Sequence, residues 1–223
     1  VTAKEREALT EMDYPARAAF IIGKYLPELK DELPSMCEKA YSRFDGDPAP
    51  LVKIEDNFYL LELWHGPTHA FKDMALTLLP YLLTGSKRVL GRTDRTLILV
   101  ATSGDTGKAA LEGFRDVDGT DCIVFYPSGG VSELQQLQMQ TQKGENVFVS
   151  AIEGNFDDAQ TAVKKIFTDD AVRNNLSLLG YNLSSANSIN WGRLVPQIAY
   201  YFSAYADLVS SGEIEDGDKV AFS

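Results

Sequence analysis

Residues 96–107 read TLILVATSGDTG, and the fold class follows from this stretch. The residues up to Ala101 are apolar or β-branched, as in a strand that is buried on both faces. Small and polar residues then lead into a helical pattern, so the stretch predicts a strand, a tight turn and a helix. The same order recurs along the chain. Strands are expected at 58–63, 96–101, 122–126, 147–152 and, more weakly, 180–183. Helices are expected at 72–83, 106–115, 132–142, 157–167 and 192–209.

This alternation predicts an α/β fold with parallel sheets flanked by helices. In such sheets ligands bind where the carboxyl ends of strands meet the N-termini of helices, so the turns after the strands are the candidate sites. Residues 1–50 read as helical, with a second helix at about 30–44. The composition at Val1 is typical of the interior of a chain, and residues 219–223 predict the start of another strand. The sequence is therefore expected to be cut at both ends.

Composition excludes several classes of protein. With 223 residues, of which 44% are hydrophobic and 10% aromatic, the chain can bury a core, which excludes a disordered tail and a coiled coil. The net charge of −11 disfavours nucleic acid and anionic membrane surfaces, and no apolar run is long enough to span a bilayer. Cys37 and Cys122 are far apart in the sequence, and each has apolar neighbours, which predicts buried, inert thiols. A cytoplasmic protein is expected.

The turn at 65–73, HGPTHAFKD, places Lys72 at the start of a helix, where the positive local field does not favour a cation. One hypothesis is that this field and partial burial lower the pKa of the amine, which then attacks a carbonyl to form a Schiff base. The alternative is an ordinary lysine paired with Asp73. Both histidines of the chain lie in this turn, but no third ligand is near them, so no metal is expected.

The turn after 96–101 carries hydroxyl and glycine residues at the start of a helix. Thr102, Ser103 and Thr106 supply hydroxyls, and the glycines allow the backbone to approach a ligand closely. This pattern favours a cradle for a carboxylate or a phosphate. The alternative is a capped helix without a ligand. The residues do not match a phosphate-binding P-loop, because Ala109 stands where that motif needs Ser or Thr.

Two further turns are less informative. The turn at 128–132, SGGVS, precedes a glutamine-rich helix and either binds an anion or caps that helix. The turn at 153–158, EGNFDD, is acidic, which disfavours an anion, so Asp157 or Asp158 is expected to cap the next helix.

The stretch at 184–193, SSANSINWGR, collects hydroxyl and amide side chains ahead of Arg193. A planar guanidinium beside such donors suits a phosphate or a carboxylate. Arg193 is therefore a candidate anion clamp within an acidic chain. The alternative is a surface arginine that pairs with an acidic residue.

Together these turns resemble the threonine synthase family, from about Tyr14 to Ser223. The resemblance is carried by four segments that occur in the family's order: 63–73 (LWHGPTHAFKD), 101–107 (ATSGDTG), 154–160 and 184–197. It implies the pyridoxal-phosphate fold type II shared with tryptophan synthase β and cysteine synthase. It also implies conversion of O-phospho-L-homoserine and water into L-threonine and phosphate. Alternatives within this resemblance are a phospho-lyase that releases a 2-oxo acid and a non-catalytic relative.

The resemblance assigns roles to particular residues. Lys72 would be the catalytic lysine that binds the cofactor. Asp105 would also bind the cofactor, and it stands where relatives have an asparagine beside the cofactor's 3-hydroxyl. The substrate's carboxylate would be held by Thr102, Ser103 and Thr106, and its phosphate by Asn187, Ser188 and Arg193, with Asn190 as a helper.

The resemblance also implies an organisation for the chain. Residues 1–80 would be part of a larger cofactor-binding domain, 81–190 a smaller substrate-binding α/β domain, and 191–223 a return to the larger one. The glycine-rich loop for the cofactor's phosphate and the residues near the pyridine ring would lie beyond the chain. The turn at 154–158 only superficially resembles that loop. The protein is expected to act on a small molecule, as a monomer or a homodimer, and this piece alone would bind the cofactor weakly.

Overall fold

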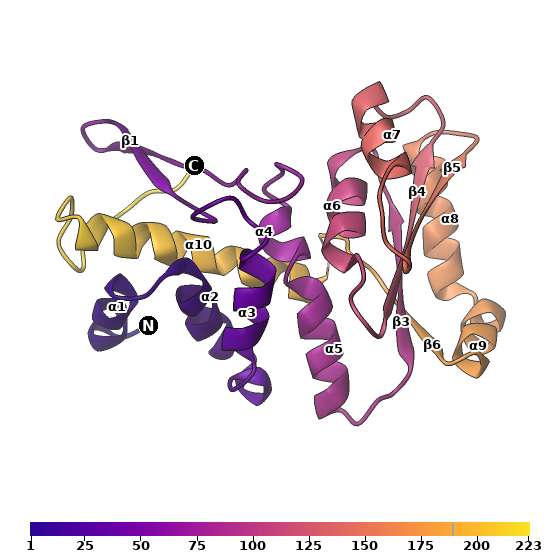
Figure 1. Ribbon diagram of the computed structural model, residues 1–223, viewed down its shortest axis with the longest axis horizontal. Helices are drawn as coiled ribbons and strands as arrows, with labels where there is room; N and C mark the ends of the chain where they lie inside the picture. The colour runs from indigo at the N-terminus through magenta and orange to yellow at the C-terminus, as the bar shows by residue number, and fades with distance from the viewer. Residues whose placement is uncertain (189) are drawn as a thin grey trace. The chain divides into compact units, whose positions relative to one another are not determined.

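The computed structural model describes residues 1–188 and 190–223, and these divide into two units (Figure 1). One unit comprises Val1–Met74 and Val195–Ser223, and the other comprises Ala75–Leu194. The chain thus leaves the first unit near residue 74 and returns to it near residue 195. Which unit binds cofactor and which binds substrate stays a prediction.

The first unit is mostly helical, as the opening residues predict. Its helices are α1 (Ala3–Thr10), α2 (Tyr14–Gly23), the 3-10 helix η1 (Pro27–Leu29), α3 (Leu33–Tyr41) and most of α10 (Trp191–Ser210). Asp13 caps α2 by accepting a hydrogen bond from the backbone of Ala16 at 3.0 Å. The buried Arg17 side chain donates to Leu9 O at 2.8 Å and to Asp207 Oδ1 at 2.5 Å, so it ties α2 to α1 and α10.

The first unit also contains a β-hairpin, which corrects one sequence-based expectation. Strand β1 (Leu51–Glu55) pairs antiparallel with β2 (Phe58–Leu61), whereas the sequence pattern put 58–63 first in a parallel series. Only Asp56 and Asn57 separate the two strands, and Asn57 has a φ of 63°. So short a turn can join only antiparallel neighbours, because a parallel pair needs a long crossover.

The second unit is built on a parallel sheet with the strand order β5-β4-β3-β6. The sequence predicted all four strands, which are β3 (Arg95–Ala101), β4 (Thr120–Pro127), β5 (Val147–Ile152) and β6 (Tyr181–Ser184). The helices are α5 (Leu79–Val89), α6 (Asp105–Phe114), α7 (Glu133–Gln140), α8 (Phe156–Thr168) and α9 (Asp170–Leu178). Figure 1 shows α5 and α6 on one side of the sheet and α8 and α9 on the other. Ile98, Val100, Cys122, Val124 and Phe114 belong to the core between them.

Three other expectations are wrong in detail. The helix expected at 72–83 is split into α4 (Asp73–Leu76) and α5, because Pro80 in the first turn of α5 lacks an N–H and its ring would clash with the carbonyl of Leu76. Helix α9 was not predicted, although the half-buried Val172 and Leu176 are spaced four positions apart on it; the helix is only nine residues long and none of its residues is fully buried. Residues 219–223 form no strand in this structure.

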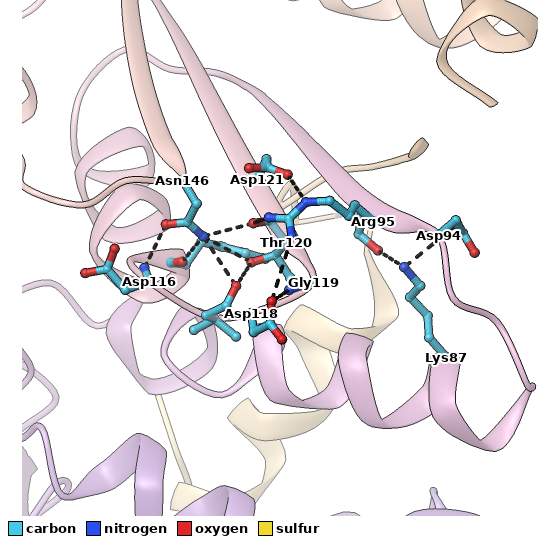
Figure 2. Close-up of polar contacts among 12 residues, drawn as sticks. Lys87, Asp94, Arg95, Asp116, Asp118, Gly119, Thr120, Asp121 and Asn146 are labelled. Carbon is cyan, nitrogen blue, oxygen red and sulfur yellow. Dashed lines mark hydrogen bonds and ion pairs between the residues drawn. The ribbon is translucent and has the colours of Figure 1, made fainter. Parts of the chain in front are cut away.

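A buried asparagine fastens the second unit at the amino end of its sheet (Figure 2). Asn146 is only 8% exposed, and its Nδ2 donates to Phe114 O at 2.9 Å, Val117 O at 3.3 Å and Thr120 O at 2.9 Å. Its Oδ1 accepts from Asp116 N at 2.7 Å. One side chain ahead of β5 therefore supplies hydrogen-bond partners to backbone groups of the loop that joins α6 to β4. Without it these groups would be buried without partners.

Asn146→Asp is expected to destabilise the protein by about 2–4 kcal/mol, because a carboxylate would face three carbonyl oxygens and the donor would be lost. The midpoint of urea-induced unfolding measures this loss. Asn174→Asp on the exposed face of α9 is the matched control and should leave the midpoint unchanged. Equal midpoints for the two variants would show that the Asn146 network is dispensable.

Candidate functional site

The sheet of the second unit brings two of the predicted segments to the same edge. Strands β3 and β6 are parallel neighbours, with Ile98 opposite Ser184. The hydroxyl-rich turn follows β3, and the segment that leads to Arg193 follows β6. Because carboxyl ends of parallel strands share one edge, residues about 85 positions apart in sequence emerge together there.

The turn after β3 is organised around Thr102. Its side chain is buried, and Oγ1 accepts hydrogen bonds from Gly104 N at 3.0 Å and Gly107 N at 2.9 Å while lying 3.0 Å from Gly104 O. The hydroxyl thus caps α6 and shapes the turn. Ser103 is exposed and Thr106 is half-buried, so these two side chains are the accessible hydroxyls of the turn.

Two positions in this turn have no space for a Cβ atom, and both are glycines. Gly104 has a φ of 154°, and a Cβ there would lie 2.5 Å from Gln135 Nε2. A Cβ on Gly107 would lie 2.5 Å from Thr102 Cγ2. At both positions the backbone is in close contact with side chains of the protein itself, so these glycines serve internal packing, and a cradle for a ligand at this turn stays a prediction.

Asp105 begins α6 and is exposed. Its Oδ1 accepts a hydrogen bond of 2.8 Å from Gln135 Nε2, which belongs to α7. The carboxylate at the start of α6 also interacts favourably with the positive end of the helix dipole.

The segment after β6 folds back on itself through Asn190. The side chain of Asn190 donates to Ser185 O at 2.6 Å and accepts from Gly192 N at 2.9 Å. Asn187 is half-buried and Ser188 is exposed beside this turn. Ile189, in the middle of the segment, lies outside the described residues.

Arg193 is buried, which excludes the surface arginine considered in the sequence analysis. It is only 6% exposed, and its Nη1 donates to Ala186 O at 2.9 Å. Burial lowers the pKa of its guanidinium from the usual value. A cation withdrawn from water gains most from an anion that shares its site, so this position suits an anionic group.

The turn that carries Lys72 lies in the first unit and is held by Asp73. Asp73 is fully buried, and its carboxylate accepts from Thr68 N at 2.8 Å and Thr68 Oγ1 at 2.6 Å. A Cβ on Gly66 would lie 2.5 Å from Asp73 Cβ, so the chain passes very close to this carboxylate. Lys72 is half-buried, with Nζ 5.1 Å from the ring centroid of Phe71. Asp73 thus has a structural role that the sequence did not reveal.

The remaining predicted groups have structural partners. His65 Nε2 lies 2.7 Å from Glu62 Oε2, and His69 Nδ1 lies 3.2 Å from Trp64 O. Both cysteines are buried free thiols, and burial raises the pKa of Cys37 to about 12. Across the described parts of the chain, no three His, Cys, Asp or Glu side chains gather as a metal site.

The two less informative turns cap helices. Ser132 and Gln135 form a capping box at α7, with hydrogen bonds of 3.3 Å in both directions. Asn155 caps α8, and the Asp158 carboxylate accepts from Asn155 N at 2.8 Å. Of the two expected acidic caps, Asp158 completes the box, but the capping residue itself is Asn155.

Gln135 is the site-neighbouring residue that sequence reasoning missed. The spacing of Ser132 and Gln135 is the signal of a capping box and predicts the start of α7. It does not predict that the amide also reaches Asp105, because that contact joins turns after two different strands.

Comparison with known proteins adds a family relationship to this geometry. Threonine synthase of Pseudomonas aeruginosa is 48% identical over 173 residues, which are 77% of this chain and 35% of that protein. Human threonine synthase-like 1 is 44% identical over 178 residues, which are 77% of this chain and 24% of that protein. The crystal structure of PLP-bound threonine synthase from Brucella melitensis matches with a TM-score of 0.84 and 40% identity, over 93% of this chain and 44% of that one.

No protein-family model matches the chain. The chain spans less than half the length of each of these three relatives. Among the helices of the described residues, none combines the length and apolar character that crossing a membrane requires.

Proposed function

Because the chain is threonine synthase-like and has the α/β architecture of pyridoxal-phosphate enzymes of fold type II, we propose that it supplies part of the active site of a threonine synthase. The proposed reaction converts O-phospho-L-homoserine and water into L-threonine and inorganic phosphate. The observation that carries the proposal is the buried Arg193 at the sheet edge that also presents the Ser103–Thr106 turn. That edge combines a clamp for one anionic group with donors for another.

The residues present fit pyridoxal phosphate in their chemistry. The cofactor carries an aldehyde, which needs a primary amine, and Lys72 supplies one in a half-buried turn. The turn after β3 would lie beside the flat ring, and Gly104, with a φ of 154°, gives that turn a backbone conformation that other residues rarely adopt. Asp105 would lie beside the ring's 3-hydroxyl. When bound, the cofactor supplies an electron sink for carbanions formed on the substrate.

The substrate has two anionic ends, and the chain offers a separate group of donors for each. Arg193, with Asn187 and Ser188, would bind the phosphate, and Asn190 would hold their turn in shape through its bond to Ser185. Ser103 and Thr106 would bind the carboxylate directly. Thr102 would contribute through the turn, since its hydroxyl already bonds Gly104 and Gly107.

The proposed chemistry assigns one role to each of these side chains. The Lys72 amine moves protons between neighbouring carbons of the substrate as general base and general acid. The phosphate leaves from the γ-carbon, and Arg193 stabilises the charge that develops on the leaving oxygen. Water then adds at the β-carbon to give threonine.

Product analysis of the full-length protein with O-phospho-L-homoserine tests the proposal. We expect threonine and inorganic phosphate in equal amounts. Release of phosphate with 2-oxobutyrate in place of threonine would contradict the synthase and favour the phospho-lyase. Absence of phosphate release from a protein that binds the cofactor would overturn both and favour the non-catalytic relative.

A further inference from the structure

Gln135 links the turn after β3 to the turn after β4. Its amide Nε2 donates to Asp105 Oδ1 at 2.8 Å, across an interval of 30 residues. Its position is fixed from the other side as well, since Oε1 accepts from Ser132 N at 3.3 Å. The amide therefore has its acceptor and its donor both committed, and it cannot rotate without losing both bonds.

The surrounding structure holds this amide in place. A Cβ on Gly104 would lie 2.5 Å from Gln135 Nε2, so the backbone of the turn is packed against the amide. Gln140, one to two turns further along α7, donates to Tyr126 Oη at 2.9 Å, and Gln142 donates to Glu112 Oε2 at 2.9 Å. Amides on α7 and just beyond its end thus join this segment to β4 and α6, and among them Gln135 contacts Asp105.

We propose that Gln135 is a positioning residue that orients Asp105 for the cofactor, an inference that rests on the proposed function. A surface aspartate samples several rotamers, and a fixed amide donor restricts it to one. Gln135 would therefore set the direction of the carboxylate beside the cofactor's 3-hydroxyl.

Gln135→Glu separates this role from helix capping. A glutamate at this position still accepts from Ser132 N and completes a capping box, so α7 keeps its start. It cannot donate to Asp105, and two carboxylates then face each other, which disfavours ionisation of the pair. Gln140→Glu is the matched control, because it makes the same substitution on the same helix and contacts Tyr126 instead.

The readout is the pH titration of the bound cofactor's visible band in the full-length protein. We expect Gln135→Glu to raise the midpoint by about one pH unit, a tenfold change in proton affinity, and Gln140→Glu to leave it within about 0.3 unit. Other charged groups on the two helices, Glu133 on α7 and Lys108 and Glu112 on α6, are unchanged in every variant. Melting temperatures measured without cofactor check that each variant folds.

A reciprocal exchange completes the test. In the double variant Gln135→Glu with Asp105→Asn, an amide at 105 can donate to the carboxylate at 135, so the hydrogen bond is restored with its direction reversed. We expect the midpoint to return to that of Asp105→Asn alone. A Gln135→Glu midpoint equal to that of the unsubstituted protein would overturn the positioning role, whereas the lack of any visible band in the unsubstituted protein would overturn the proposed function instead.

Discussion

Lys72→Ala is expected to abolish turnover of O-phospho-L-homoserine and to remove the visible absorbance of the bound cofactor. The loss in kcat should be at least about 1,000-fold, because the same amine would hold the cofactor's aldehyde and move the substrate's protons. Lys72 is half-buried on a turn anchored by Asp73, so removal of its side chain leaves that anchor intact.

Lys72→Arg is the matched variant for charge. An arginine keeps the cation but does not deprotonate near neutral pH, so it cannot act as the nucleophile. Both variants should fold with melting temperatures close to that of the parent protein. Reduction of the cofactor-loaded protein with borohydride, followed by peptide mass mapping, should find the cofactor on residue 72. A stable adduct on any other lysine would contradict the assignment.

Arg193→Lys is expected to weaken the binding of the substrate's phosphate group. A lysine retains the charge but loses the planar fork, and loss of charge-assisted hydrogen bonds of about 2–3 kcal/mol corresponds to about a 100-fold rise in the dissociation constant. The effect should be large because Arg193 is buried, where neither water nor salt replaces its contacts readily.

Competition by inorganic phosphate measures this change in the full-length enzyme. Its inhibition constant should rise with the KM for O-phospho-L-homoserine, while binding of an unphosphorylated amino acid stays nearly constant. Arg173→Lys on the exposed face of α9 is the control and should change neither constant. Phosphate inhibition that is the same in Arg193→Lys and in the parent protein would rule out the clamp. Melting temperatures separate a weakened site from a weakened fold.

Local patterns account for most of the secondary structure. The apolar runs ahead of Thr102 and Ser128 predict β3 and β4 because a strand buried on both faces needs apolar residues throughout. Where local pattern and tertiary packing compete, prediction failed. Helix α9 is short and has no fully buried residue, so its apolar spacing is easily missed. Pro80 divides a helix whose apolar spacing runs continuously.

The candidate site divides in the same way. The sequence was sufficient to single out Lys72, the Thr102–Thr106 turn and Arg193, because each carries reactive or anion-binding groups next to a helix start. It could not establish that Arg193 is buried, or that the Thr102 hydroxyl accepts hydrogen bonds from the backbone of its own turn. Burial and hydrogen-bond partners depend on what the rest of the chain places nearby.

By itself, then, the sequence determined the parallel α/β class, the four strands of the sheet and the residues with distinctive chemistry. Only the tertiary structure decided the order β5-β4-β3-β6, the antiparallel hairpin and the contact between Gln135 and Asp105. The physical reason is the sequence separation over which each kind of interaction acts. Strand and helix signals arise among neighbours in the chain, whereas sheet order is set by which apolar faces pack together across long separations, and that order places the turns after β3 and β6 side by side.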